Sequence, residues 1–370
     1  MSATHDQAQT ETQTGTTYLY FVSLTAAVGG FLFGYDLNII TGAMLFMQDY
    51  FGIEGAQLGF LTSSAIFGCV FGALLATWMA DAAGRRNSLH IAAVLFFISA
   101  VWSALATTIP SFAIARAIGG VGVGIATGVS PMYIAEIAPA HLRGRMVTVN
   151  QLSIVAGIVL SVVVALLLSY GGHWRIMFAS ECVPVVALMA GLLFVPLSPR
   201  WLASRGRTDE ALRILTRVNG VGRAQAVMDE IRVELAKETG AFRELLQPGV
   251  RYALLVACIL MVFQQVNGVN MMLIYASKIL VEAGIGSISN ALLNSLMVYF
   301  LILFSTIVAF YIVAKFPRRA ILMAGVTAMA VGHIVMAAAF HLKASPLVNL
   351  LAMLIATGAF TLTLAPLGWV

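Results

Sequence analysis

Residues 147–170 read VTVNQLSIVAGIVLSVVVALLLSY, a continuous run that contains no charged side chain. About 20 residues of α-helix cross the apolar core of a bilayer, which is about 30 Å thick. An uncharged run of this length therefore predicts a transmembrane helix.

Similar stretches recur along the whole chain and are mostly bounded by charged residues, proline, glycine or asparagine. We predict ten spans, at residues 18–41, 58–80, 88–109, 112–134, 147–170, 174–196, 252–277, 290–313, 320–341 and 347–370. Charged residues make up 10% of the 370 residues and hydrophobic residues 60%, whereas soluble proteins are roughly 25% charged. So few charges cannot cover a soluble globule of this size, and the composition predicts an all-α polytopic membrane protein.

The basic residues are distributed unevenly between the two sets of loops. Three of them, Arg175, Lys278 and Lys343, lie in loops after odd-numbered helices, and Arg116 lies inside a helix. The other Lys and Arg residues follow even-numbered helices, and loops rich in Lys and Arg stay in the cytoplasm. We therefore expect a cytoplasmic N-terminus.

Because these charges sit at helix ends, nucleic acid is not an expected partner. The cysteines all lie in apolar segments and do not indicate a disulfide scaffold.

The order of the segments predicts four parts. Residues 1–17 form a polar cytoplasmic tail without the basic residues of a signal peptide. Residues 18–196 form a six-helix bundle, 197–250 a cytoplasmic helical linker, and 251–370 the first four helices of a second bundle. The segments Asp81-Ala-Ala-Gly-Arg-Arg86 and Ala314-Lys-Phe-Pro-Arg-Arg319 follow helices 2 and 8, as in a repeat. Repeated bundles with a site between them are a common transporter plan, and we expect ten of twelve helices in this chain.

Asp36 and Arg116 are ionisable residues that lie within predicted membrane spans. Charges in that position are costly and mark candidate functional sites. Both are expected toward the outer half, where they can meet. Removal from water disfavours the charged form of an acid, while a nearby Arg favours it. A change in the access of water to Asp36, or in its distance from Arg116, can make Asp36 gain or lose a proton, and a proton carrier must do this. The alternative is a static ion pair that holds two helices together.

Four amides gather in the seventh span, in Gln264-Gln-Val-Asn-Gly-Val-Asn270. An amide offers both donors and acceptors, which suits a neutral polyhydroxylated ligand. The alternative is hydrogen bonding between helices, but four amides around a glycine that lets the helix bend exceed that need. The residues do not indicate a metal cluster, a catalytic set or a cofactor.

Charged residues near the predicted cytoplasmic surface form a candidate gate. We expect Glu136 and Glu181 to face the inner ends of their helices and to pair with nearby arginines. The predicted gate comprises Asp81, Arg85, Arg86, Glu136, Arg143, Arg145, Glu181, Arg200, Arg318 and Arg319.

Several motifs together resemble the sugar porter family of the major facilitator superfamily, most closely its bacterial proton–xylose symporters. The matching segments are Gly29–Asp36, Asp81–Arg86, Arg116 with Gly119 and Gly120, Pro131–Pro139 with Arg143-Gly-Arg145, Pro196–Trp201, and Gln264–Asn270 with Tyr275. The resemblance implies two six-helix bundles, a central sugar site and alternating access in a bacterial inner membrane.

The same resemblance assigns roles to individual residues. It implies that Asp36 and Arg116 couple proton movement to transport. It implies that sugar is bound by Phe33, Gln264, Gln265, Asn270, Tyr275 and Trp369. An Asp at position 36 favours symport, because passive relatives resemble this motif with Asn there. The expected partners are a monosaccharide, a proton and the lipid bilayer, with a monomer as the working unit.

Three departures bear on this reading. Ile158 stands where xylose- and glucose-carrying relatives place a sugar-binding Gln, so the sugar can differ. Leu197 replaces a Glu after helix 6, and Ala314 and Pro317 replace Asp and Gly after helix 8, which should weaken the gate.

Proton-coupled import of a pentose or hexose is the main hypothesis. A passive sugar facilitator and a membrane sugar receptor without transport are the alternatives.

Overall fold

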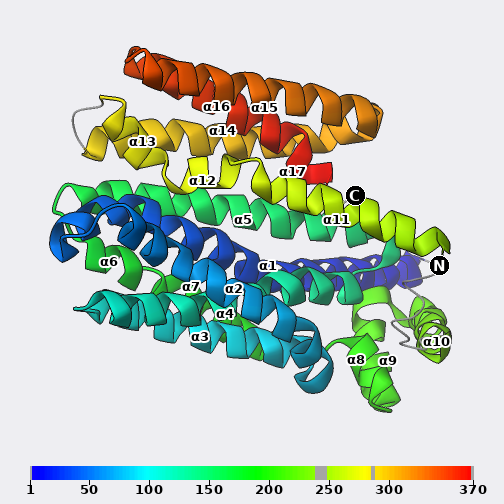
Figure 1. The fold of residues 1–370 in the computed structure, drawn as a ribbon. Helices are drawn as coiled ribbons and strands as arrows, with labels where there is room; N and C mark the ends of the chain where they lie inside the picture. Colours follow the sequence, from blue (N-terminus) through cyan, green and yellow to red (C-terminus); the bar gives the residue numbers. More distant parts are fainter. Residues whose placement is uncertain (1, 238–247, 285–287, 368–370) are drawn as a thin grey trace. The chain divides into compact units, whose positions relative to one another are not determined.

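The computed structural model describes residues 2–237, 248–284 and 288–367, and every regular element in these ranges is a helix (Figure 1). Nine helices among the described residues are long and apolar enough to cross a membrane. They are Thr17–Phe51, Ala56–Ala83, Arg85–Leu105, Ile109–Ile137, Leu142–Ser169, Trp174–Phe194, Val250–Ile274, Asn290–Ala309 and Arg318–His341. Each coincides with one of the first nine predicted spans, and the prediction of an all-α polytopic membrane protein is confirmed.

Contacts divide the chain into two compact units. The first unit contains the chain up to Asp36, residues 51–157, and the chain from Arg175 to the end of α10. Its helices are α1 (Ser2–Phe51) as far as Asp36, α2 (Ala56–Ala83), α3 (Arg85–Leu105), α4 (Ile109–Ile137), α5 (Ala140–Ser169) as far as Gly157, α6 (Trp174–Ala179), α7 (Cys182–Phe194), α8 (Pro199–Ser204), α9 (Thr208–Asn219) and α10 (Val221–Lys237).

The second unit contains Leu37–Tyr50 of α1, Ile158–Trp174, and the chain from α11 onward. Its further helices are α11 (Pro248–Val266), α12 (Val269–Ile274), α13 (Ala276–Glu282), α14 (Ile288–Lys315), α15 (Arg318–His341), α16 (Pro346–Leu362) and α17 (Leu364–Leu367). Helix α16 packs against α14 and α15. The boundary between the units therefore falls inside the continuous helices α1 and α5, and the predicted division into consecutive bundles stays a prediction.

Glycines allow α2 and α4 of the first unit to pack closely. A Cβ atom on Gly68 or Gly72 of α2 would meet the backbone of α4, and one on Gly120 or Gly124 would meet the backbone of α2. Small residues four apart permit such an approach of helix backbones. The contact brings α4, which carries Arg116, into the interior of the first unit.

The linker forms a small helical layer of its own. Helices α9 and α10 lie within the stretch 197–250, where a helical linker is expected, and they pack with α8. A cluster of buried apolar side chains holds the three helices together, formed by Leu202, Ala211, Leu215, Ala224 and Met228. Burying such side chains on one face is what stabilises an amphipathic helix.

The seventh predicted span is broken rather than continuous. Helix α11 ends at Val266, and Gly268 adopts φ 86°, a left-handed conformation that costs least for glycine. The Asn267 side chain replaces the lost helical hydrogen bonds, because its Nδ2 donates to the Gln264 carbonyl at 2.9 Å and its Oδ1 accepts from the Val269 N–H at 2.9 Å. The bend expected at this glycine is confirmed.

The tenth predicted span is wrong in its extent. Helix α16 ends at Leu362, Thr363 leaves the helical conformation, and a short helix α17 follows. Pro366 has no N–H with which to bond the Leu362 carbonyl four residues earlier, and its ring disfavours a continuous helix there. Residues 368–370 lie outside the described part of the chain.

Candidate functional site

Asp36 of α1 and Arg116 of α4 form a buried ion pair. Arg116 Nη1 bonds Asp36 Oδ1, and Nη2 donates to the Asp36 backbone carbonyl at 2.8 Å. Both side chains are almost completely buried, with exposed fractions of 0% and 1%. The guanidinium also lies over the Phe178 ring, 5.5 Å from its centroid. The structure thus brings together the two residues that the sequence singled out within the membrane spans.

Glu181 is a third member of this group, and its predicted placement at the cytoplasmic gate is wrong. It lies at the junction of α6 and α7, fully buried, and interacts electrostatically with Asp36 and Arg116. The reason is its position in the span, because Glu181 follows Trp174 by only seven residues, near the end opposite to the basic loop. The short distance in sequence between Glu181 and the start of the span is the signal that indicates the depth of Glu181 in the membrane.

The three side chains leave a charge imbalance in the interior of the first unit. Two carboxyl groups face one guanidinium and also interact with each other, and Asp36 Oδ2 and both Glu181 carboxyl oxygens meet no N–H or hydroxyl donor of another side chain among the described residues. Two ionised acids beside one base leave a net negative charge out of water, which is costly. Uptake of one proton makes the group neutral, so this arrangement can bind and release a proton.

A neighbouring contact fixes α1 against the junction of α6 and α7. The Tyr35 hydroxyl and Ser180 Oγ lie 2.6 Å apart, directly beside Asp36 and Glu181 in the sequence. Ser180 Oγ also bonds the Met177 carbonyl at 2.6 Å. The contact between Tyr35 and Ser180 therefore holds Asp36 of α1 and Glu181 next to each other.

The predicted sugar ligands of the second unit lie around the break in the seventh span. Asn270 of α12 donates through Nδ2 to Gln265 Oε1 at 2.7 Å, so these two amides are brought together across the break. Tyr275 ends α12. Phe33 belongs to the first unit, and Trp369 lies outside the described residues.

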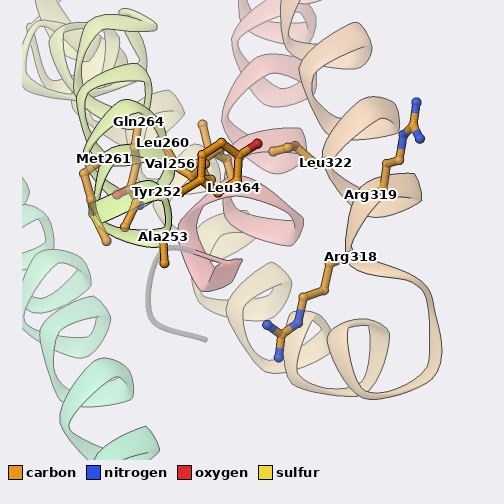
Figure 2. A pocket seen from close by; sticks show the side chains of 11 residues that line it. Tyr252, Ala253, Val256, Leu260, Met261, Gln264, Arg318, Arg319, Leu322 and Leu364 are labelled. Carbon is orange, nitrogen blue, oxygen red and sulfur yellow. The ribbon is translucent and has the colours of Figure 1, made fainter. Parts of the chain in front are cut away.

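Gln264 has different surroundings from its neighbour Gln265. It lines a cavity of about 730 Å³ together with residues of α11, α15 and α17, namely Tyr252, Ala253, Val256, Ala257, Leu260, Met261, Arg318, Arg319, Leu322 and Leu364. In Figure 2 Leu322 and the side chains of α11 surround this space, while Arg318 and Arg319 extend from the start of α15. Successive residues of a helix point about 100° apart, which accounts for the separation of the two amides.

A buried polar network in the second unit connects α1 with α12, α13 and α14. The Tyr299 hydroxyl lies 3.1 Å from Asn38 Oδ1 and 2.7 Å from the Leu273 carbonyl. Ser277 Oγ donates to the Thr41 carbonyl at 2.6 Å. Because Leu273 and Ser277 flank the end of α12, these bonds hold the segment that carries Asn270 and Tyr275. No pattern in the sequence reveals this network, since its residues are far apart in the chain.

The predicted gate is partly assembled in the first unit. Arg85 pairs with Asp81 at 3.2 Å and with Glu136 at 2.9 Å. Glu136 also accepts a hydrogen bond from Ser198, and Arg86 donates to the Val195 carbonyl at 3.2 Å. Tyr133 bonds the Pro196 carbonyl, so the segment after α7 is fastened although Leu197 carries no charge.

The remaining gate residues are arranged differently. Arg200 pairs with Glu234 of α10 at 2.9 Å, in a partly exposed position. Arg143 and Arg145 are exposed, and the described residues offer no ion pair to them. Arg318 and Arg319 belong to the second unit and border the cavity of Figure 2. Among the predicted gate residues of the first unit, the ion pairs therefore centre on the buried Arg85, with Asp81 and Glu136 as its partners.

Comparison with known proteins gives consistent matches along almost the whole chain. A family model described as "Sugar (and other) transporter" matches residues 22–370. The D-xylose-proton symporter of Escherichia coli (strain K12) is 38% identical, over 97% of this chain and 80% of the relative. The galactose-proton symporter of the same strain is 33% identical, over 95% and 77%. An E. coli arabinose-proton symporter is 35% identical, over 85% and 67%.

A solved structure matches as well. The partially occluded inward-open conformation of the xylose transporter XylE from E. coli superimposes with a TM-score of 0.87 at 36% identity, covering 95% of this chain and 86% of that one.

Proposed function

The chain belongs to the sugar transporter family of the major facilitator superfamily, and from that membership we propose that it imports a monosaccharide together with a proton. It is an integral membrane protein. The observation that carries proton coupling is the buried group of Asp36, Arg116 and Glu181, in which two acids share one base. A proton taken up there changes the net charge of the interior by one unit.

The proposed cycle begins with a proton from outside binding the free Oδ2 of Asp36. A neutral Asp36 holds Arg116 less strongly, and Glu181 is the acid that remains to attract the guanidinium. The exchange of partners loosens α1 from α4. Sugar then crosses by alternating access, and the proton leaves Asp36 on the inner side.

The membrane potential assists sugar accumulation by drawing the proton inward. A potential of 100 mV contributes about 2.3 kcal/mol per charge, enough for roughly fortyfold accumulation.

We propose a neutral pentose or hexose as the substrate. The hydrogen-bonded amides of Gln265 and Asn270 support this, because amides both donate to and accept from sugar hydroxyls. The relatives with xylose, arabinose and galactose in their names support the same class. We propose Phe33, Gln264, Tyr275 and Trp369 as further sugar-binding residues.

The orientation and gate follow from the distribution of charge. We propose that the N-terminus is cytoplasmic, which places the Asp81–Arg85–Glu136 group at the inner surface and the end of α3 at the outer surface. Ion pairs that form only when the inner side is closed would act there as a latch. We propose a monomer as the transporting unit.

The test is transport by the purified protein in liposomes with an acidic exterior. Asp36→Asn should abolish sugar accumulation and sugar-driven alkalinisation of the medium, while exchange of labelled for unlabelled sugar continues. Asp49→Asn, at an exposed position of the same helix, is the matched control and should behave as wild type. If Asp36→Asn still accumulates sugar, the coupling role is wrong. Exchange by the wild type without alkalinisation would identify a passive facilitator.

A further inference from the structure

Helix α3 carries two buried hydroxyls that have no partner. Ser99 and Ser103 are both 0% exposed, and neither Oγ has a hydrogen-bond partner in the described ranges. Serine in a helix commonly bonds a carbonyl of the preceding turn. Ser88 of the same helix does so, with its Oγ donating to the Gly84 carbonyl at 2.9 Å. Unsatisfied buried hydroxyls are costly, so two of them in one helix require an explanation.

Ser99 lies beside Asp36. The position that a Cβ atom would take on Gly119 of α4 is in contact with Ser99 Oγ and is 3.7 Å from Asp36 Oδ2. The absence of a side chain at Gly119 therefore lets the hydroxyl and the carboxylate approach each other. Oδ2 is also the Asp36 oxygen that Arg116 leaves unbonded. The hydroxyl thus approaches the oxygen that is open to a proton.

Ser103 extends this line of polar atoms toward the end of α3. Residues four apart share one face of a helix, and four residues rise by about 6 Å. Helix α3 packs against α4 and against α7, whose first turn follows Glu181. The charged groups that face this interior are Asp36 from α1, Arg116 from α4 and Glu181 from the start of α7.

We propose that Ser103 and Ser99 form the path by which a proton from the outer surface reaches Asp36. This inference rests on the proposed proton-coupled transport and on its orientation. A hydroxyl accepts a proton on its oxygen and passes its own proton onward, so each serine ends the step unchanged after its O–H rotates. The proton ends on Asp36 Oδ2. Ser99 is hydrogen-bonded neither to Ser103 nor to Asp36 Oδ2 among the described residues, so the proposed path requires a bridging water molecule at each of these two gaps, bound through the free donors and acceptors of the hydroxyls.

The experiment measures the initial rate of sugar-driven proton entry into liposomes that contain a pH-sensitive dye. The variants are Ser99→Ala, Ser103→Ala and the double variant, with Ser88→Ala as the matched control on the same helix. We expect the double variant to slow proton entry on the order of tenfold, at the lower end of proton-transfer effects because water substitutes in part. Sugar exchange should remain at the wild-type rate, and the H₂O/D₂O rate ratio should rise only in the serine variants.

A second variant keeps both serines in the sequence but displaces one of them. The methyl group of Gly119→Ala would overlap Ser99 Oγ and lie 2.9 Å from Ser99 Cβ, so Ser99 must move, and proton entry should slow with the same rise in the H₂O/D₂O rate ratio as in the serine variants. The inference is overturned if the double variant and Ser88→Ala show the same proton entry rate and isotope ratio. It is equally overturned if exchange falls in parallel with proton entry, because the serines would then be structural. Persistence of coupling in Asp36→Asn would instead reject the proposed function itself.

Discussion

Asp36 and Asn38 lie two residues apart on α1, yet their side chains belong to two different buried networks. Asp36 pairs with Arg116 in the first unit, and Asn38 bonds Tyr299 in the second. Two steps along a helix turn the side chain by about 200°, so the two residues point to nearly opposite sides. The residue that pairs with Arg116 and the residue that bonds Tyr299 are therefore carried by a single turn of one continuous helix.

Glu181 should be required for efficient proton uptake. Glu181→Gln leaves Asp36 and Arg116 as a neutral pair, which removes the excess negative charge that favours binding of a proton. We expect sugar-driven proton entry at neutral external pH to fall on the order of tenfold, with sugar exchange retained. Glu282→Gln, at an exposed position of α13, should not change either rate. Equal proton entry in Glu181→Gln and wild type would contradict a role for this acid.

Removal of Arg116 should destabilise the protein. Arg116→Gln leaves the buried Asp36 carboxylate without its partner, and breaking a buried pair in this way costs about 3–5 kcal/mol. Thermal unfolding in detergent should show a lower midpoint. Adding Asp36→Asn to this variant should recover part of the loss, because the unpaired charge is then gone. Strictly additive effects of the two substitutions would show that the pair contributes no coupling energy.

The Tyr299 hydroxyl should stabilise the segment that carries Asn270 and Tyr275. Tyr299→Phe removes one donor from this network, while Asn38 Oδ1 keeps its bond from Thr41 and the Leu273 carbonyl keeps its bond from the Tyr275 N–H; a lost buried hydrogen bond of this kind contributes about 0.5–1.5 kcal/mol. We expect a lower midpoint of thermal unfolding and a higher KM for sugar exchange. Tyr311→Phe, at an exposed position of the same helix, is the matched control. An unchanged KM would separate this network from the sugar site.

The left-handed conformation of Gly268 should be needed for the break between α11 and α12. Alanine at φ 86° is strained by about 1–2 kcal/mol. Gly268→Ala should therefore lower stability and raise the KM for sugar, since Gln265 and Asn270 meet across this break. Gly59→Ala in α2, where a Cβ meets open space, serves as control and should be neutral. Wild-type sugar affinity in Gly268→Ala would rule out a functional break.

The two predicted gate contacts of the first unit should differ in importance. Glu136→Gln weakens a pair with Arg85 in which both side chains are 10% exposed, and it should reduce the maximal rate of uptake several-fold. Glu234→Gln weakens the exposed pair with Arg200, and such pairs contribute about 0–1 kcal/mol. Initial uptake rates at saturating sugar test the comparison. Similar losses in both variants would argue against a gate centred on Arg85.

The fold was largely predictable because the constraint that sets it is local. Each apolar stretch must satisfy its own backbone within lipid, and only a helix does this without partner strands. The first nine spans, and the bend at Gly268, follow from residues adjacent in the sequence. The end of α16 was also encoded locally, by Pro366, but the apolar composition of 347–370 concealed it.

Sequence alone therefore determined the helical membrane fold and marked Asp36 and Arg116 as costly charges within it, since burial of charge depends on composition along a single span. Only the tertiary structure decided that Glu181 joins them, that Asn38 meets Tyr299, and that Ser99 approaches the free oxygen of Asp36. Such contacts depend on the rotation and level of helices distant in the chain, and these are set by packing at positions such as Gly119, where the absence of one side chain allows two others to approach.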